Sequence, residues 1–323
     1  MVHENKKNDI LTVALAQLAP VWLDRDKTID KICTAVIDAA ERNSNLVVFG
    51  EALLPGYPFW IERTNGANFN SKMQKELHAH YMQQAIVPEQ GDLDSITTLA
   101  REHKIAIYLG TIERAVNRGG HSLYCSMIYI NEFGEIKSVH RKLMPTYEER
   151  LTWANGDGHG LVTHSLGAFT LGGLNCWENW MPLPRAALYA LGEDLHVAIW
   201  PGGLHNTQDL TRMLAKEGRS YVVSVSGLMR TEDFPDSTPY LKEIIAGGPE
   251  GIIANGGSCL AGPDGSWVIE PIIDKEALRI ADIDHQLVRA ERQNFDPSGH
   301  YSRPDVTQLI VNRKRQAIVK FED

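Results

Sequence analysis

The sequence predicts an α/β domain in which two β-sheets are layered between helices. Two short runs, 46–49 and 197–200, are entirely apolar, which is typical of strands covered on both faces. Strand–helix–strand patterns recur in both halves of the chain, and neither a composition shift nor a linker separates the halves. The 323 residues are therefore interpreted as one domain over 1–310 with a short C-terminal tail over 311–323.

Hydrophobic spacing predicts the elements of the first half. Residues 26–42 repeat apolar side chains at helical intervals, so an amphipathic helix is expected there. Residues 53–60 hold two prolines and a glycine, which predicts a loop after the strand at 46–49. The other expected elements are strands at 12–18, 105–112 and 123–130 and helices at 71–87 and 92–103.

The second half repeats this order. Pro-Gly-Gly ends the apolar strand at 197–200, and Pro-Asp-Gly at 263–265 indicates a hairpin. The expected elements are strands at 161–164, 168–175, 222–229, 258–261, 266–270 and 277–282 and helices at 182–191, 209–221 and 285–294.

The composition disfavours two classes of partner. The chain has 32 Lys and Arg against 41 Asp and Glu, and this net charge of −9 is unsuited to nucleic acid and to anionic membranes. The polar start does not resemble a secretory signal, and the longest stretch without charged residues, 158–177, is too rich in glycine and polar residues for a membrane helix. Four cysteines without a CxxC do not indicate a disulfide framework, so we expect a soluble cytoplasmic protein.

A carboxylate follows the first fully apolar strand. Glu51 stands just after the strand at 46–49, at the sheet rim where α/β proteins place their sites. Burial there would raise its pKa and suit it to accept a proton as a general base. A rim glutamate in an ordinary salt bridge would show the same sequence pattern.

A lysine and a cysteine stand in similarly suggestive positions. Lys142 precedes two apolar residues, so one interpretation is an inward side chain that needs a carboxylate partner, but its run, 140–150, taken alone favours a solvated loop. Cys176 follows the strand at 168–175 and precedes a helix, an order that resembles a nucleophile elbow. A nearby cation such as Lys142 would favour its thiolate, and an inert buried thiol is the alternative.

Other chemistries have weak support in the sequence. His78 and His80 are two residues apart, so on a helix they point in different directions and do not form a metal-ligand pair. The glycines at 156, 158 and 160 do not lie between a strand and a helix, and GxSxG is absent. Neither a metal nor a cofactor is expected.

Together these motifs resemble those of the carbon–nitrogen hydrolases of the nitrilase superfamily. The family's Glu, Lys and Cys occur in this chain order and match Glu51 in FGEALLPGYPFW, Lys142 in HRKLMPTYEER and Cys176 in GGLNCWENWMPLP. The family's second glutamate matches Glu149. The segment DPSGHYSRPDV at 296–306 is also similar to that of nitrilases.

The residues after the cysteine indicate the nitrilase branch. Trp177 and Glu178 are similar to nitrilases, whereas amidases of the superfamily usually have Tyr or Phe and then Asp. One position departs from the family pattern, because Ala154 follows Trp153 where the family commonly has glycine. The four matched positions are unaffected by this departure.

The resemblance implies a four-layer αββα sandwich that hydrolyses an organic nitrile to the carboxylic acid and ammonia. Cys176 would attack the nitrile carbon, giving a thioimidate and then a thioester, while Glu51 acts as general base and Lys142 stabilises negative charge. Glu149 would position Lys142 and tune Glu51. An amide by-product forms if the tetrahedral intermediate expels the thiol. No metal or organic cofactor is implied.

The sequence gives less direct evidence on substrate binding and on assembly. Tyr57, Trp60 and Trp177 are the aromatic residues nearest to the motifs, so we expect them to line the substrate pocket, with core packing as the alternative. The resemblance implies a homo-oligomer, since family members form dimers and nitrilases often stack them into spirals. The tail after Val306, only 17 residues long, argues against long filaments.

Three other functions stay open. One is an amidase or carbamoyl-hydrolase of the same superfamily, and another is an enzyme that hydrolyses cyanide. The third is a non-catalytic interaction protein built on the same fold.

Overall fold

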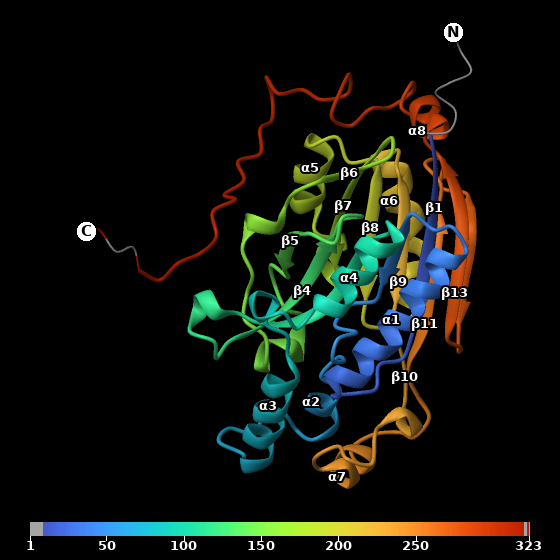
Figure 1. Ribbon diagram of the computed structural model, residues 1–323. Coiled ribbons are helices and arrows are strands. Elements are labelled where there is room, and N and C mark those ends of the chain that lie inside the picture. The colour runs from blue at the N-terminus through green and yellow to red at the C-terminus, as the bar shows by residue number, and fades with distance from the viewer. Residues whose placement is uncertain (1–8, 320–321, 323) are drawn as a thin grey trace.

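Two β-sheets pack face to face in the computed structural model, which describes residues 9–319 and 322 (Figure 1). The first sheet has six strands, of which the second, third and fourth in spatial order run parallel. In order across the sheet they are β13 (Ala277–Asp284), β1 (Ile10–Gln17), β2 (Leu46–Phe49), β3 (Ala106–Arg114), β4 (Leu123–Ile130) and β5 (Ile136–Arg141).

The second sheet has seven strands and a similar parallel centre. In order across the sheet they are β10 (Leu228–Arg230), β11 (Ile252–Ala261), β9 (Tyr221–Ser226), β8 (Leu195–Trp200), β7 (Phe169–Asn175) and β6 (His164–Leu166), and β12 (Trp267–Ile273) pairs with β11. Strands β7, β8 and β9 run parallel. In both sheets, therefore, the three parallel strands at the centre end at the same edge.

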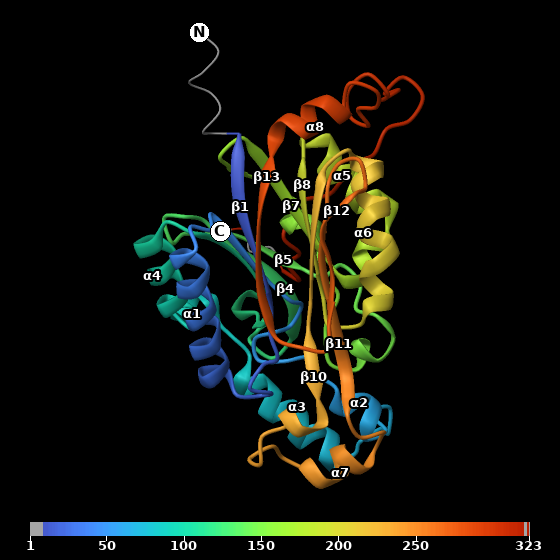
Figure 2. The ribbon, with the colours of Figure 1, turned by 90° about the vertical axis from the view of Figure 1, so that its right-hand side faces the viewer.

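Helices cover the outer face of each sheet, so the layers are helix, sheet, sheet and helix (Figure 2). The first sheet is covered by α1 (Arg25–Glu41) and α4 (Asp94–His103), and the second by α5 (Pro182–Ala190) and α6 (Leu204–Gly218). The predicted αββα sandwich is thus confirmed. The remaining helices lie at the two ends of the sandwich: α2 (Trp60–Arg63), α3 (Lys72–Gln84) and α7 (Leu241–Ala246) at one end, and α8 (His285–Glu291) at the other.

Short 3₁₀ helices, labelled η, lie in the connections. The two that follow β5 and β7 carry groups of the candidate site described below. They are η3 (Tyr147–Leu151) and η5 (Cys176–Trp180); the others are η1 (Pro88–Gln90), η2 (Val116–Arg118), η4 (Gly158–Gly160) and η6 (Thr231–Asp233).

The main core lies between the two sheets. Strand residues that face inward from both sheets are almost fully buried, and burial of such apolar surface is the dominant favourable contribution to folding. This layer includes Leu15, Val48, Tyr108, Leu171, Val197 and Val223. A second apolar layer joins α1 and α4 to the first sheet, and a third joins α6 to the second sheet.

Strand ends from both sheets meet at one point. The carbonyl of Trp200, the last residue of β8, accepts hydrogen bonds from the backbone N–H groups of Glu51 at 3.1 Å and of Gly227 at 3.0 Å. Glu51 of the first sheet is thereby fixed against the second sheet. Cys176 follows β7, which is the neighbour of β8. The two residues therefore reach the same edge of the sandwich.

Several elements differ from the sequence-based expectation. The expected strand at 222–229 is divided into β9 and β10 at Gly227, where a Cβ would lie 2.2 Å from the Pro201 carbonyl oxygen. The expected strand at 161–164 is wrong, because η4 precedes it and β6 begins only at His164. Helix α6 begins at Leu204 rather than at 209. The polar segment that forms β5, and the helix α7, were not expected.

The C-terminal segment runs along the surface after α8 (Figure 1). Residues 292–319 contain no helix or strand. Arg315 forms an ion pair with Asp157 at 3.0 Å, which ties this segment to the domain. The proposed domain boundary at 310 stays a prediction. Within the described residues, no helix has both the length and the apolar character that crossing a membrane requires.

The packing behind Glu51 leads to a testable prediction for Gly110→Ala on β3. A Cβ at this position would lie 2.1 Å from the Gly50 carbonyl oxygen and 2.7 Å from the Glu51 Cα. We expect the substitution to lower the free energy of unfolding by about 1–3 kcal/mol, because backbone must move to admit the methyl group. Urea denaturation measures this difference.

Gly262→Ala is the matched control, since its nearest new contact would be a side-chain oxygen of Asp264 at 3.2 Å. Equal losses of stability in the two variants would contradict the tight packing at Gly110.

Candidate active site

Glu51 lies just after β2 in a position that solvent barely reaches. The residue is 2% exposed. Its Oε1 atom forms an ion pair with Lys142 Nζ at 2.9 Å and accepts a hydrogen bond from the Cys125 thiol at 3.5 Å. Its Oε2 atom has no hydrogen-bond partner among the described residues. One oxygen of this carboxylate is therefore held in place while the other is free to accept a proton.

Lys142 places its ammonium group between two buried carboxylates. The residue directly follows β5 and is 1% exposed. Nζ lies 2.8 Å from Glu149 Oε2 and 2.9 Å from Glu51 Oε1. The backbone N–H of Lys142 donates to the Cys125 carbonyl at 2.8 Å, which continues the pairing of β5 with β4 by one residue. The side chain thus points inward and is paired, so the solvated loop is the wrong alternative for Lys142.

Glu149 is held by more donors than Glu51. It is buried within η3, and its Oε2 atom also accepts from the backbone N–H of Thr146 at 2.6 Å. Its Oε1 atom accepts from the Tyr57 hydroxyl at 3.0 Å. Tyr57, one of the three predicted pocket aromatics, therefore reaches the site through its hydroxyl group.

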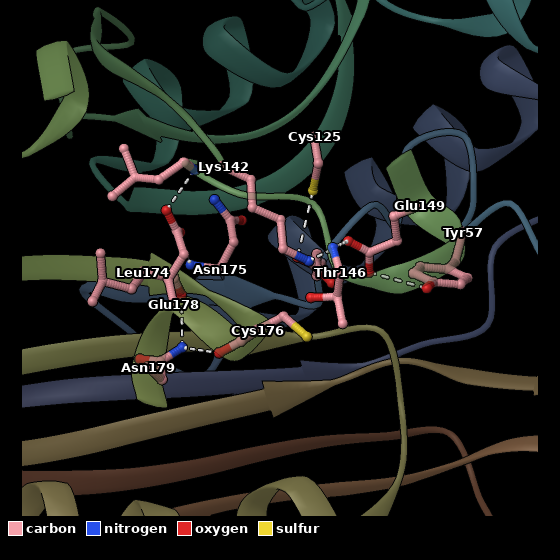
Figure 3. Close-up of polar contacts among 12 residues, drawn as sticks. Tyr57, Cys125, Lys142, Thr146, Glu149, Leu174, Asn175, Cys176, Glu178 and Asn179 are labelled. Carbon is pink, nitrogen blue, oxygen red and sulfur yellow. Dashed lines mark hydrogen bonds and ion pairs between the residues drawn. The ribbon is translucent and has the colours of Figure 1, made fainter. Parts of the chain in front are cut away.

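Cys176 begins η5 at a sharp turn directly after β7. Its backbone φ is +48°, an uncommon value for a residue with a Cβ. The carbonyl of Cys176 accepts from Asn179 Nδ2 at 2.9 Å, which fixes the turn. The Cys176 sulfur and one carboxylate oxygen each from Glu51 and Glu149 lie within 4.8 Å of one another. Figure 3 shows Lys142, Glu149 and Cys176 converging on this space.

The charges of the site shift the pKa values of its groups. Burial raises the pKa of Glu51 to about 7; the Lys142 ammonium opposes this shift, and the Glu149 carboxylate adds to it. Burial and the Glu51 charge raise the pKa of the Cys176 thiol well above its usual value, against the effects of Lys142 and of the Trp177 backbone N–H.

For the pKa of Lys142, nearby charges outweigh burial. Burial by itself would lower its pKa, but the thiolate form of Cys176 and the charges of Glu51 and Glu149 would each favour the ammonium, and together they hold the pKa well above its usual value. The site therefore rests as a neutral thiol beside a permanent cation and a carboxylate of unusually high proton affinity. That is a suitable arrangement for moving a proton from sulfur to oxygen.

Three of these groups are also close enough to ligate a metal ion. The ammonium of Lys142, however, contacts both carboxylates and already supplies positive charge at that place. A metal ion would have to displace it. That no metal is required stays a prediction.

The other two predicted aromatics have different surroundings. Trp60 is 1% exposed and packs against Trp22 and Tyr81, with ring centroids 6.2 and 4.8 Å apart respectively. These contacts are typical of core packing, which was the alternative to a place in the substrate pocket. Trp177 is 54% exposed, so its ring is accessible to a ligand. Binding of substrate by Tyr57, Trp60 and Trp177 stays a prediction.

Sequence reasoning missed three residues that contact the site or a residue next to it. Cys125 lies within β4, where nothing in its local pattern distinguishes it from an ordinary core thiol. Asn179 fixes the carbonyl of Cys176 and in turn accepts from His196 Nε2 at 2.7 Å, with Nε2 acting as the donor. His140 contacts Glu178 at 3.0 Å. The only signal was closeness in sequence, of Asn179 to Cys176 and of His140 to Lys142.

The sequence and the fold match a known class of enzymes. A family model described as carbon-nitrogen hydrolase matches residues 12–293. The chain therefore belongs to the carbon–nitrogen hydrolase family. The family resemblance inferred from the motifs is thus confirmed.

Two similar proteins carry more specific names. Nitrilase 2 of Arabidopsis thaliana is 33% identical over 97% of this chain and 91% of its own length. An aliphatic nitrilase of Rhodococcus rhodochrous is 33% identical over 94% of this chain and 82% of its own length.

Solved structures support the fold. A carbon–nitrogen hydrolase of Helicobacter pylori G27 aligns with a TM-score of 0.68 at 20% identity, covering 92% of this chain and 96% of that chain. An amidase of Nesterenkonia sp. aligns with a TM-score of 0.64 at 20% identity, covering 88% of this chain and 94% of that chain. At these identities the likeness concerns the fold alone.

Proposed function

We propose that this chain is a nitrilase that hydrolyses an organic nitrile to its carboxylic acid and ammonia. The observation that carries the proposal is the Lys142 ammonium, which lies within 2.9 Å of Glu51 and 2.8 Å of Glu149 beside the Cys176 thiol. The similarity to proteins named nitrilase over nearly the whole chain supports the choice of substrate.

The first half of the reaction forms a bond between sulfur and carbon. The Glu51 carboxylate takes the proton of the Cys176 thiol, and the sulfur attacks the nitrile carbon. The C≡N bond loses one π bond, and its nitrogen takes from Glu51 the proton that came from the thiol, which leaves a covalent thioimidate and returns Glu51 to its carboxylate form. The Lys142 ammonium and the backbone N–H of Trp177 offset the negative charge that develops during this attack.

The second half releases the two products. Glu51 activates a water molecule, which adds to the thioimidate carbon and gives a tetrahedral intermediate. Loss of ammonia leaves a thioester, and a second water molecule hydrolyses it to the carboxylic acid and the free thiol. If the tetrahedral intermediate expels the thiol instead of ammonia, the product is the amide.

Glu149 has a supporting role in this proposal. Its carboxylate holds Lys142 through Oε2, and the Tyr57 hydroxyl holds its other oxygen. Its negative charge also raises the pKa of Glu51. No step requires a metal ion or an organic cofactor. A cytoplasmic location is part of the proposal and is supported by the free thiols of Cys33, Cys125, Cys176 and Cys259.

Ammonia release from cyanide, from a panel of organic nitriles and from the matching amides tests the proposed activity. We expect nitrile turnover in the parent protein and at least about a thousandfold loss in Cys176→Ala, because that variant has no nucleophile. Cys33→Ala is the matched control, since Cys33 is a half-buried thiol on α1, away from the site. Turnover of amides alone would replace the proposal with an amidase, and turnover of cyanide alone with a cyanide hydrolase. Absence of any turnover in folded protein would support a non-catalytic role.

The pH dependence of kcat/KM tests the role of Glu51. A base works only when it is deprotonated, so lowering the pH through its pKa removes the active form. Because the pKa of Glu51 is raised to about 7, we expect kcat/KM to fall below about pH 7. Circular dichroism over the same range controls for unfolding. Activity that stays constant well below this pH would exclude Glu51 as the titrating base.

We further propose that the chain forms a homo-oligomer, dimers or larger. Support comes from apolar side chains exposed around the start of α5, since exposed apolar patches often mark interfaces. They are Trp177, Trp180, Met181 and Leu183, which are 54%, 53%, 37% and 63% exposed.

Light scattering tests this assembly. We expect a molar mass that is a multiple of the 36.0 kDa chain, and a smaller mass for Leu183→Glu, because a charge would be buried at the interface. Phe133→Glu is the control, since Phe133 is similarly exposed, at 64%, in the turn between β4 and β5. A monomeric parent protein would refute the proposal.

A further inference from the structure

Glu178 is a buried carboxylate close to the site that the proposed reaction does not use. It lies two residues after Cys176 within η5 and is 1% exposed. Its Oε1 atom accepts a hydrogen bond from the backbone N–H of Leu143 at 2.7 Å, and its Oε2 atom accepts from that of Asn175 at 2.8 Å. His140 Nε2 lies 3.0 Å from Oε2 and 3.1 Å from Oε1.

The two backbone partners of Glu178 flank two groups of the site. Leu143 directly follows Lys142, and Asn175 directly precedes Cys176. Lys142 follows a strand of the first sheet, and Asn175 ends a strand of the second. One carboxylate therefore joins the segment that carries the lysine to the segment that carries the cysteine. Figure 3 shows Glu178 between Asn175 and the backbone near Lys142.

Because Glu178 is buried, it needs both of its backbone hydrogen bonds. A buried carboxylate is tolerated only when hydrogen bonds replace the lost water. Burial raises the pKa of Glu178, but His140 and the N–H groups of Leu143 and Asn175 outweigh burial and keep the pKa below its usual value. Both backbone segments must hold their positions for this balance, since loss of either donor would leave a buried charge with an unused acceptor.

We propose that Glu178 is a positioning residue that fixes Lys142 relative to Cys176 across the two sheets. Glu178 acts through the backbone on either side and does not touch the reacting atoms. The role in catalysis rests on the proposed function, because it assumes that Lys142 and Cys176 act together. The positional role of Glu178 can be measured without any nitrile.

Glu178→Gln is the test variant. The amide is nearly the same size, but its NH₂ group is a donor, so it cannot accept from one of the two backbone N–H groups. Glu178→Asp is the second variant, because its carboxylate keeps the charge but is too short to reach both donors. It serves if Glu178→Gln does not fold.

Asp194→Asn is the matched control. Asp194 is also a buried carboxylate, with one oxygen accepting from the Thr170 backbone N–H at 2.7 Å and the other paired with His285 at 2.8 Å. Thr170 lies near the start of β7, at the opposite end of that strand from Cys176. Loss of this bridge therefore affects stability without moving the site.

Three quantities are measured in each variant. The first is the rate of Cys176 alkylation by iodoacetamide, which peptide mass spectrometry monitors. The others are kcat and KM for a nitrile and the thermal midpoint of unfolding. In the Glu178 variants we expect alkylation to slow by about tenfold and kcat to fall by about a hundredfold with little change in KM, the loss typical of a misplacement near 1 Å. Asp194→Asn should retain parent values of both while its thermal midpoint falls.

The outcomes separate the two proposals. Glu178 variants that lose thermal stability but alkylate and turn over like Asp194→Asn would overturn the positioning role. If the parent protein hydrolyses no nitrile while the Glu178 variants still alkylate slowly, the proposed function fails and the positioning role stands.

Discussion

The site depends on one buried cation shared by two carboxylates. Lys142 is in hydrogen-bond contact with Glu51 and Glu149, and all three residues are almost fully buried. Each buried charge costs several kcal/mol in lost hydration, and only close pairing offsets that cost. With both carboxylates ionised, the three groups carry one negative charge in excess. The site therefore has a strong tendency to take up one proton.

The donors around the carboxylates decide where that proton goes. Glu149 accepts from Lys142, from the Thr146 backbone N–H and from the Tyr57 hydroxyl. Glu51 accepts through Oε1 alone, and its Oε2 atom has no partner among the described residues. The pKa of Glu51, which lies beside the Cys176 thiol, is raised to about 7. The same asymmetry gives the two glutamates different surroundings, although both lie close to one lysine.

Much of this arrangement could be predicted from the sequence, and the reasons are specific. Glu51 and Cys176 each follow an apolar strand, and strands of a layered sheet end at a common edge. Lys142 adjoins apolar residues, which indicated an inward side chain. In contrast, Glu51 contacts Lys142 and Cys125, which lie far from it in the sequence. No local pattern encodes those contacts.

The surroundings of Trp60 and the strand β5 were not predicted, and both failures have physical reasons. Trp60 is close to the Glu51 motif in sequence, but α2 turns its ring into a cluster with Trp22 and Tyr81, so nearness along the chain did not predict its surroundings. Strand β5 was not recognised because its six residues mix charged, polar and apolar side chains without alternation. Its strand conformation comes from pairing with β4, which the segment itself does not specify.

The hydrogen bond from Glu51 to the carbonyl of Trp200 has a consequence for how the protein acquires activity. Glu51 follows a strand of one sheet and Cys176 follows a strand of the other, so neither sheet alone brings the groups of the candidate site together. In a partly folded state with one sheet formed, Cys176 does not have Glu51 and Lys142 beside it. The candidate site is therefore complete only in the closed sandwich, and under the proposed function the appearance of activity during refolding marks the docking of the two sheets in register.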